Sequence, residues 1–113
     1  MASDVIKRGD IYRVNLEPTL GSEQQGRARP CVVLSITPFN KQFKTVGVVP
    51  LSSSARVHEP VTVSVPSAGE GAVALCYQLR TIDKARLLKP MGELAAADMA
   101  AIEVAVKQVY GLN

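Results

Sequence analysis

A chain of 113 residues with 47% hydrophobic and 20% charged residues has the size and composition of one globular domain. This composition excludes a disordered tail, a collagen-like repeat and a coiled coil. No apolar run approaches the roughly 18 residues of a membrane-spanning helix, and residues 1–10 lack the hydrophobic stretch of a signal peptide. We therefore expect a single domain over residues 1–113, located in the cytoplasm and without a membrane anchor.

Positive charge gathers in the first half of the chain. Residues 1–56 carry eight Lys or Arg against four Asp or Glu, a net charge of +4, whereas residues 57–113 carry five against six, a net charge of −1. This asymmetry suits an anionic partner such as a nucleic acid or an acidic peptide, although an ordinary soluble surface is equally compatible with it.

Few side chains are available to hold a metal ion or to act as a catalytic nucleophile. Cys31 and Cys76 each lie in an apolar run, 45 residues apart, so we expect two buried thiols and neither a redox pair nor a zinc site. His58 is the single histidine and lies in a polar segment, and no G-x-S-x-G motif is present. A two-histidine nuclease and a Ser-His triad are therefore excluded, and no metal or cofactor is expected.

The pattern of apolar residues predicts five or six short strands. Alternation with a period of two indicates a half-buried strand, and an apolar run rich in β-branched residues indicates a strand covered on both faces. In chain order, the predicted strands cover residues 10–16, 30–36, 44–51, 61–65, 72–78 and, as a short sixth, 86–88. Residues 17–28 have no periodicity and are interrupted by Pro18, Gly21 and Gly26, which predicts a long loop of the kind that often carries function.

The period changes near the C-terminus, where the sequence predicts one amphipathic helix. Apolar residues there repeat every three or four positions, at Met99, Ile102, Val106 and Val109, and Gly111 lies where a C-terminal cap is expected. No helix separates the predicted strands, so a parallel βαβ arrangement is disfavoured. The sequence predicts a mainly β fold of the α+β class, a small, partly closed antiparallel barrel with the helix on one side.

Several motifs follow one another in a specific order. Residues 8–30 read RGDIYRVNLEPTLGSEQQGRARP, which contains an RGD-[IV]-[YW] start, an acidic-Pro-Thr turn, a G-[SH]-E-Q loop and an Arg-Pro strand start. The later segments are VVPLSS at 48–53, QLRTIDKARL at 78–87 and GELAAADMAAIEVAV at 92–106. Together they resemble the MazF/PemK (Kid-like) family of toxin endoribonucleases of type II toxin-antitoxin systems. The resemblance extends over essentially the whole chain, with one clear irregularity, a one-residue insertion between Gly26 and Pro30.

The resemblance implies an SH3-like barrel, which the family shares with the CcdB gyrase poisons. It implies a sequence-selective endoribonuclease that cleaves single-stranded RNA, with mRNA the expected target, through the substrate's own 2′-OH and without a metal ion. The implied products are a 2′,3′-cyclic phosphate and a 5′-hydroxyl. The implied partners are a second copy of the chain in a homodimer and a cognate acidic antitoxin, with which such toxins also bind DNA.

The resemblance also implies which residues carry the chemistry. Arg29 is the candidate for charge stabilisation at the phosphate, Glu23 for the base or for positioning the arginine, and Ser52 for a hydrogen bond to the phosphate. Each also has a structural interpretation, as a strand-edge arginine, a solvated loop acid and a turn serine. The candidates for RNA binding are Ser22, Gln24, Gln25, Arg27, Asn40, Ser53 and Gln78.

Two departures from the Kid-like branch leave the alternatives open. Ser22 replaces a histidine of that branch, and Leu75 to Gln78 replace an Arg-Cys-Asp-Gln stretch. A nuclease that lacks the Arg/Asp pair would use the MazF-like arrangement of Glu23, Arg29 and Ser52. The other hypotheses are a non-catalytic, CcdB-like gyrase poison and a degenerate nuclease retained for binding. In the segment RTID, Arg80 and Asp83 are interpreted as a structural salt bridge at a turn.

Overall fold

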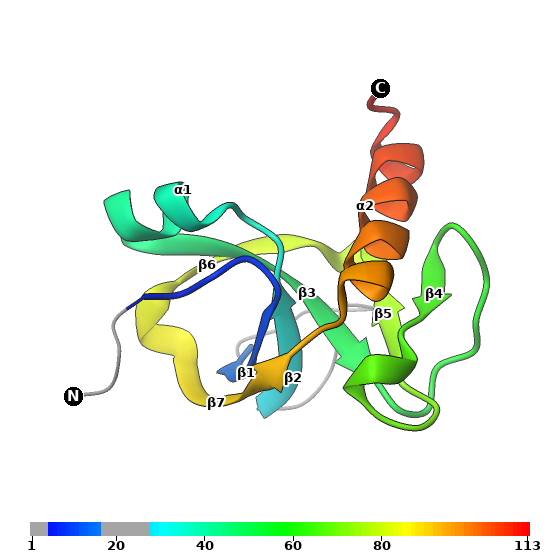
Figure 1. Cartoon of the computed structure of the whole chain (residues 1–113), viewed down its shortest axis with the longest axis horizontal. Helices are drawn as coiled ribbons and strands as arrows, with labels where there is room; N and C mark the ends of the chain where they lie inside the picture. The colour runs from blue at the N-terminus through cyan, green and yellow to red at the C-terminus, as the bar shows by residue number, and fades with distance from the viewer. Residues whose placement is uncertain (1–4, 17–27) are drawn as a thin grey trace.

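The computed structural model describes residues 5–16 and 28–113, and all structural statements below concern these residues. The strands are β1 (Asp10–Asn15), β2 (Ala28–Val33), β3 (Thr45–Ser52), β4 (Thr62–Ser64), β5 (Val73–Leu75), β6 (Arg80–Asp83) and β7 (Leu87–Glu93) (Figure 1). The α-helices are α1 (Thr37–Gln42) and α2 (Ala96–Tyr110), and three short 3-10 helices are η1 (Pro66–Ala68), η2 (Cys76–Gln78) and η3 (Lys84–Arg86).

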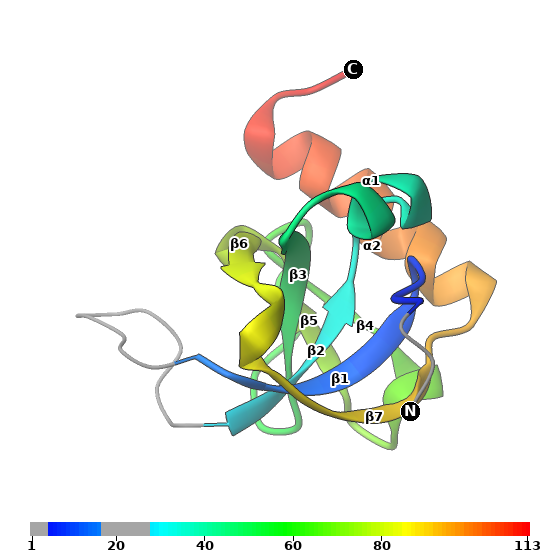
Figure 2. The same cartoon turned by 90° about the vertical axis from the view of Figure 1, so that its left-hand side faces the viewer.

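The strands form a bent antiparallel sheet that does not close. Their order is β4-β5-β3-β2-β1-β7, and β6 pairs with β3 off this path. The long strand β3 pairs with three strands: β2 lies along one edge, and on the other edge its first half pairs with β6 and its last two residues, Leu51 and Ser52, pair with β5. In Figure 2 the neighbouring strands β1, β2 and β3 lie below the two α-helices, and α1 is drawn in front of α2. Within the described part of the chain, the two strands at the ends of this order, β4 and β7, are not paired with each other, so the barrel stays open.

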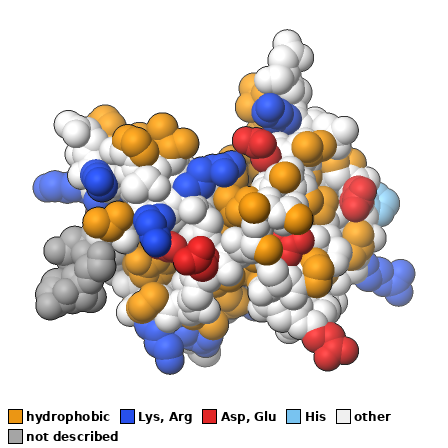
Figure 3. Space-filling model, in the orientation of Figure 1, with side chains coloured by type: hydrophobic (Ala, Val, Ile, Leu, Met, Phe, Trp, Pro, Cys, Tyr) orange, Lys and Arg blue, Asp and Glu red, His pale blue; other side chains and the backbone are white. Residues whose placement is uncertain are grey.

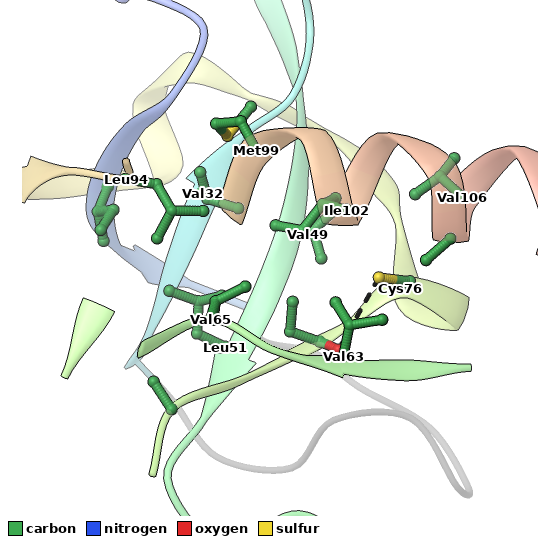
Figure 4. Close-up of a cluster of buried hydrophobic side chains, with 14 residues drawn as sticks. Val32, Val49, Leu51, Val63, Val65, Cys76, Leu94, Met99, Ile102 and Val106 are labelled. Atoms are coloured by element: carbon green, nitrogen blue, oxygen red, sulfur yellow. Dashed lines mark hydrogen bonds between the residues drawn. The ribbon is translucent and has the colours of Figure 1, made fainter. Parts of the chain in front are cut away.

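The core has two apolar clusters, one on each side of β2 and β3. Val32 and Val49 belong to the cluster that α2 covers, whereas Val33 and Val48 belong to the cluster on the other side. Both faces of these central strands are therefore buried, as their continuous apolar runs predict. The labelled side chains of the first cluster in Figure 4 are Val32, Val49, Leu51, Val63, Val65, Cys76, Leu94, Met99, Ile102 and Val106.

The helix α2 confirms the predicted amphipathic pattern. Met99, Ile102, Ala105 and Val106 are buried against the sheet, and Val109 is half-buried. Gly111 caps the helix in the left-handed conformation, with φ +68°, and its N–H donates to the last turn. The fold class is therefore the predicted one, a mainly antiparallel sheet with a C-terminal helix.

The second half of the chain differs from the predicted elements. The fifth strand ends at Leu75, and residues 76–78 form η2 where a continued strand was expected. The segment RTID is strand β6 and not a turn, and within it no ion pair joins Arg80 to Asp83. Residues three apart in a strand point to opposite faces, so the predicted salt bridge cannot form. The Asp83 carboxylate instead accepts a hydrogen bond from the Ala85 N–H at 2.7 Å.

Candidate active site

Arg29 and Ser52 line one pocket of about 200 Å³. They come from the two central strands, β2 and β3, where β2 begins and β3 ends. Cys31 pairs with Pro50 across these strands, and continuing the antiparallel register by two residues brings Arg29 level with Ser52. The full lining is Ile11, Arg29, Pro30, Leu51, Ser52, Ser53, Ala68, Gly69, Glu70, Ala72 and Met91. A cation and hydroxyls thus meet in a hollow with largely apolar walls.

Arg29 is presented by a stiff element. Its strand pairs on one side with β1, where Val14 is its partner, and the next residue is Pro30, whose ring fixes the backbone. Arg29 is half-buried and lines the pocket. A planar fork of donors held in this way suits a phosphate with two non-bridging oxygens.

Ser52 is both a turn residue and a pocket residue. Its hydroxyl oxygen accepts hydrogen bonds from the N–H groups of Ser54 and Ala55, each at 3.1 Å, and the side chain is 8% exposed. These bonds fix the chain where β3 ends. The turn interpretation of Ser52 is therefore confirmed, and the same hydrogen bonds fix its hydroxyl beside the pocket, while its contact with a phosphate stays a prediction.

Substitution of Ser52 tests its role in the turn and its expected contact with the substrate separately. We expect Ser52→Ala to lower the free energy of unfolding by about 1 kcal/mol, because two N–H groups lose their acceptor. We expect cleavage to slow by about tenfold, because one neutral hydrogen bond to the substrate is lost. Urea denaturation and single-turnover cleavage measure the two effects, with Ser64→Ala on the exposed face of β4 as the control. Cleavage at the parental rate by Ser52→Ala would leave only the structural role.

The other predicted site residues, apart from Asn40, differ in their position relative to the pocket. Glu23, Ser22, Gln24, Gln25 and Arg27 lie outside the described residues. Ser53 is exposed and lines the pocket beside Ser52. Gln78 lies in η2, away from the pocket lining, and its amide donates to the Tyr77 hydroxyl at 2.8 Å.

Asn40 has a structural environment. It is 1% exposed in α1, and its amide nitrogen donates to the carbonyl oxygens of Ile6 at 3.0 Å and Ser35 at 3.1 Å. Its side-chain oxygen accepts from the Ser35 hydroxyl, which in turn accepts from the Gly47 N–H. An amide whose donors and acceptor are all engaged with protein is not available to read a base edge, so Asn40 is left out of the proposed RNA-binding set.

The two thiols and the single histidine lie where the sequence predicts. Cys31 and Cys76 are buried and free. Burial raises the pKa of Cys31 to about 12, against a smaller lowering by the nearby Arg80 and Arg29 cations, and burial raises the pKa of Cys76 to about 11. Both thiols are therefore protonated at neutral pH and inert as nucleophiles. His58 is exposed in a loop.

The described residues contain neither a metal-binding cluster nor a membrane-spanning helix. Across residues 5–16 and 28–113, no three His, Cys, Asp or Glu side chains are grouped so that they could bind a metal ion. In the same residues, no helix has the length and apolar character needed to cross a membrane.

Several lining residues were not predicted as site residues from the sequence, among them Met91 and Glu70. Met91 comes from β7 and Glu70 from the turn between η1 and β5, so both reach the pocket only through the fold. The single sequence signal near them is the pair of glycines, Gly69 and Gly71, on either side of Glu70.

The charge on the described surface is uneven. On the face shown in Figure 3, most Lys and Arg side chains lie on the left of the view, over the strands and α1, and few lie over the right-hand part that contains β4. The Lys and Arg side chains of this face are therefore concentrated on one side of the view, which suits an anionic partner.

Comparison with known proteins identifies the family. Residues 7–110 match the family described as PemK-like, MazF-like toxin of type II toxin-antitoxin system. Endoribonuclease MazF9 of Mycobacterium tuberculosis is 33% identical over 112 residues, which cover 91% of this chain and 94% of the relative. The chain therefore belongs to the PemK-like, MazF-like toxin family. Its class is that of the toxin endoribonucleases, as the sequence predicts.

Solved structures agree with this assignment. The crystal structure of MazF from Deinococcus radiodurans is similar with a TM-score of 0.85 and 27% identity, covering 97% of this chain and 100% of that one. A MazE-MazF structure from the same organism is similar with a TM-score of 0.79 and 26% identity, covering 98% of this chain and 100% of that one. The predicted fold is thereby confirmed.

Proposed function

We propose that this toxin cleaves single-stranded RNA, with mRNA the expected target, by attack of the substrate's 2′-OH on the adjacent phosphate. The observation that supports the proposal is the convergence of Arg29 and Ser52, from neighbouring ends of β2 and β3, on one pocket. Negative charge develops on the non-bridging oxygens when the phosphate becomes pentacoordinate, and a cation and a hydroxyl in the same pocket can stabilise that charge.

The proposed reaction uses the protein's residues to stabilise charge. The 2′-oxygen forms a bond to phosphorus, its proton passes to a base, and the bond from phosphorus to the 5′-oxygen breaks as that oxygen takes up a proton. Arg29 binds the non-bridging oxygens. A guanidinium holds its protons tightly, so it stabilises negative charge and is poorly suited to act as a general acid. Ser52 donates a hydrogen bond to the same phosphate. Glu23, which lies outside the described residues, is the proposed base or the group that positions Arg29.

The proposed RNA-binding residues surround this centre. Ser53 lines the pocket, and Gln78 offers an amide farther along the surface. Ser22, Gln24, Gln25 and Arg27 complete the proposed set from the segment between β1 and β2. Amides and hydroxyls pair with base edges, and the arginine adds charge for the backbone.

The proposed partners are a second copy of the chain and a cognate acidic antitoxin. The Deinococcus radiodurans protein has been crystallised together with MazE, and the basic side of the present chain offers the complementary charge. A non-catalytic, CcdB-like gyrase poison receives less support, because the compared relative is named an endoribonuclease and Arg29 and Ser52 line the same pocket.

The test of the reaction is cleavage of a defined RNA in excess EDTA with analysis of the product ends. We expect full activity with the chelator, 2′,3′-cyclic phosphate and 5′-hydroxyl ends, and no cleavage of RNA that carries 2′-O-methyl at the cut site. The physical reason is that the attacking oxygen belongs to the substrate and is blocked by the methyl group. Loss of activity in EDTA, 5′-phosphate ends or cleavage of the methylated RNA would each overturn the mechanism.

A further inference from the structure

The wall of the pocket opposite the strand ends is a turn that carries an acidic residue. The turn between η1 and β5 supplies Ala68, Gly69, Glu70 and Ala72 to the lining that also contains Arg29 and Ser52. Glu70 is exposed, and no hydrogen bond or ion pair joins its carboxylate to any other residue of the described structure. Its two oxygens are therefore available to a ligand in the pocket.

This turn is held in place on both sides. Two glycines with positive φ, Gly69 at +137° and Gly71 at +77°, allow the reversal, and a Cβ on Gly71 would lie 3.9 Å from the carbonyl oxygen of Ser53. Backbone hydrogen bonds join Ala72 N to Gly69 O at 3.0 Å and Val65 N to Ala72 O at 2.9 Å.

The short helix η1, which leads directly into this turn, is anchored to the start of α2. The N–H of Ser67 donates to the Asp98 carboxylate at 2.8 Å, and the Ser67 hydroxyl donates to the same oxygen while it accepts from the Ala95 N–H at 2.9 Å. Glu70 is consequently presented by a preorganised wall, as a recognition residue requires.

A carboxylate beside a phosphate pocket has a restricted choice of ligand groups. It repels the phosphate that Arg29 attracts, so its productive partners on RNA are N–H and O–H donors. The apolar lining beside it, which includes Ile11 and Met91, suits the flat face of a nucleobase. Among the bases, guanine alone offers two adjacent donors, N1–H and N2–H, which match the two oxygens of a carboxylate. In uracil, by contrast, the single N–H lies between two carbonyl oxygens.

We propose that Glu70 is a specificity-determining residue that accepts the N1–H and N2–H of a guanine next to the scissile phosphate. The inference rests on the proposed function, because it places the phosphate at Arg29 and Ser52. It goes beyond the proposed function in naming guanine as the base that the pocket selects, and in assigning this selection to the turn between η1 and β5.

The test maps the cut sites of the parent protein in a long RNA of mixed sequence, followed by cleavage of short RNAs that differ at one flanking position. We expect guanine at one of the two nucleotides that flank the cut, with a preference of about tenfold over uracil, the range of a paired base contact. In Glu70→Gln and Glu70→Ala the preference should fall to within about twofold. Glu70→Asp, which keeps the charge on a shorter stem, should retain part of it.

Glu59→Gln is the matched control, since Glu59 is an exposed acid in a loop and does not line the pocket. It should keep the parental cut-site profile. A parent profile without guanine enrichment, or an enrichment that Glu70→Gln leaves intact, overturns this inference while RNA cleavage itself stands. A parent protein that cleaves no RNA overturns both this inference and the proposed function.

Discussion

Arg29→Ala is expected to slow RNA cleavage by a hundredfold or more. Among the described residues that line the pocket, Arg29 carries the one cation, so its removal takes away the charged donor that they offer to the negative charge developing on the phosphate. Removing one donor of this type from a preorganised site costs two to three orders of magnitude in other enzymes that stabilise an oxyanion. Arg29→Lys should retain part of the rate, because it keeps the charge and loses the two-pronged geometry.

The measurement is single-turnover cleavage of a saturating, defined RNA, with the melting temperature of each variant determined in parallel. Arg13→Ala is the matched control: Arg13 is an exposed arginine on the neighbouring strand β1, level with Pro30, and it does not line the pocket. It should cleave at nearly the parental rate. A folded Arg29→Ala protein that is as active as Arg13→Ala would contradict the assignment of charge stabilisation to Arg29.

The strands that could be predicted are those in which the pattern of apolar residues matches the faces that the fold buries. Residues 10–16 alternate because one face of β1 is exposed to solvent, and residues 31–33 do not alternate because this part of β2 is covered on both faces. The predicted strand over residues 30–36 was wrong beyond Val33, since Leu34 to Ile36 lie outside β2 and Ile36 is exposed. The strand β6 could not be predicted in the same way, because Ile82 is its only buried residue and a single apolar position has no period. The helix α1 is six residues long, too short for a helical repeat to show.

The site could be predicted only in part, for a similar reason. Arg29 and Ser52 are found through the resemblance, because they lie within motifs that keep their order along the chain. Glu70 and Met91 reach the same pocket from a turn and from an outer strand, and nothing in their local sequence indicates that destination. Pockets of this kind are assembled by the fold, so residues distant in the sequence become neighbours only when the sheet bends.

Asn40 shows the opposite case, in which a residue that seems suited to function belongs to the core. An amide in a polar segment predicts base reading as readily as structure, and its burial becomes visible only in three dimensions. In the fold, Asn40 joins α1 to the N-terminal segment through the carbonyl of Ile6, and to β3 through Ser35 and the N–H of Gly47. The amide therefore connects three segments that the chain brings together from separate places.

Asn40→Ala is accordingly expected to lower the free energy of unfolding by roughly 2–3 kcal/mol, because the carbonyls of Ile6 and Ser35 lose a buried donor and the Ser35 hydroxyl loses its acceptor. Urea denaturation measures the loss, and Gln42→Ala, at an exposed position of the same helix, should change stability by less than about 0.5 kcal/mol. Below its melting temperature, the Asn40→Ala protein should cut RNA at the parental sites. A variant of parental stability with an altered cut-site profile would return Asn40 to the RNA-binding surface.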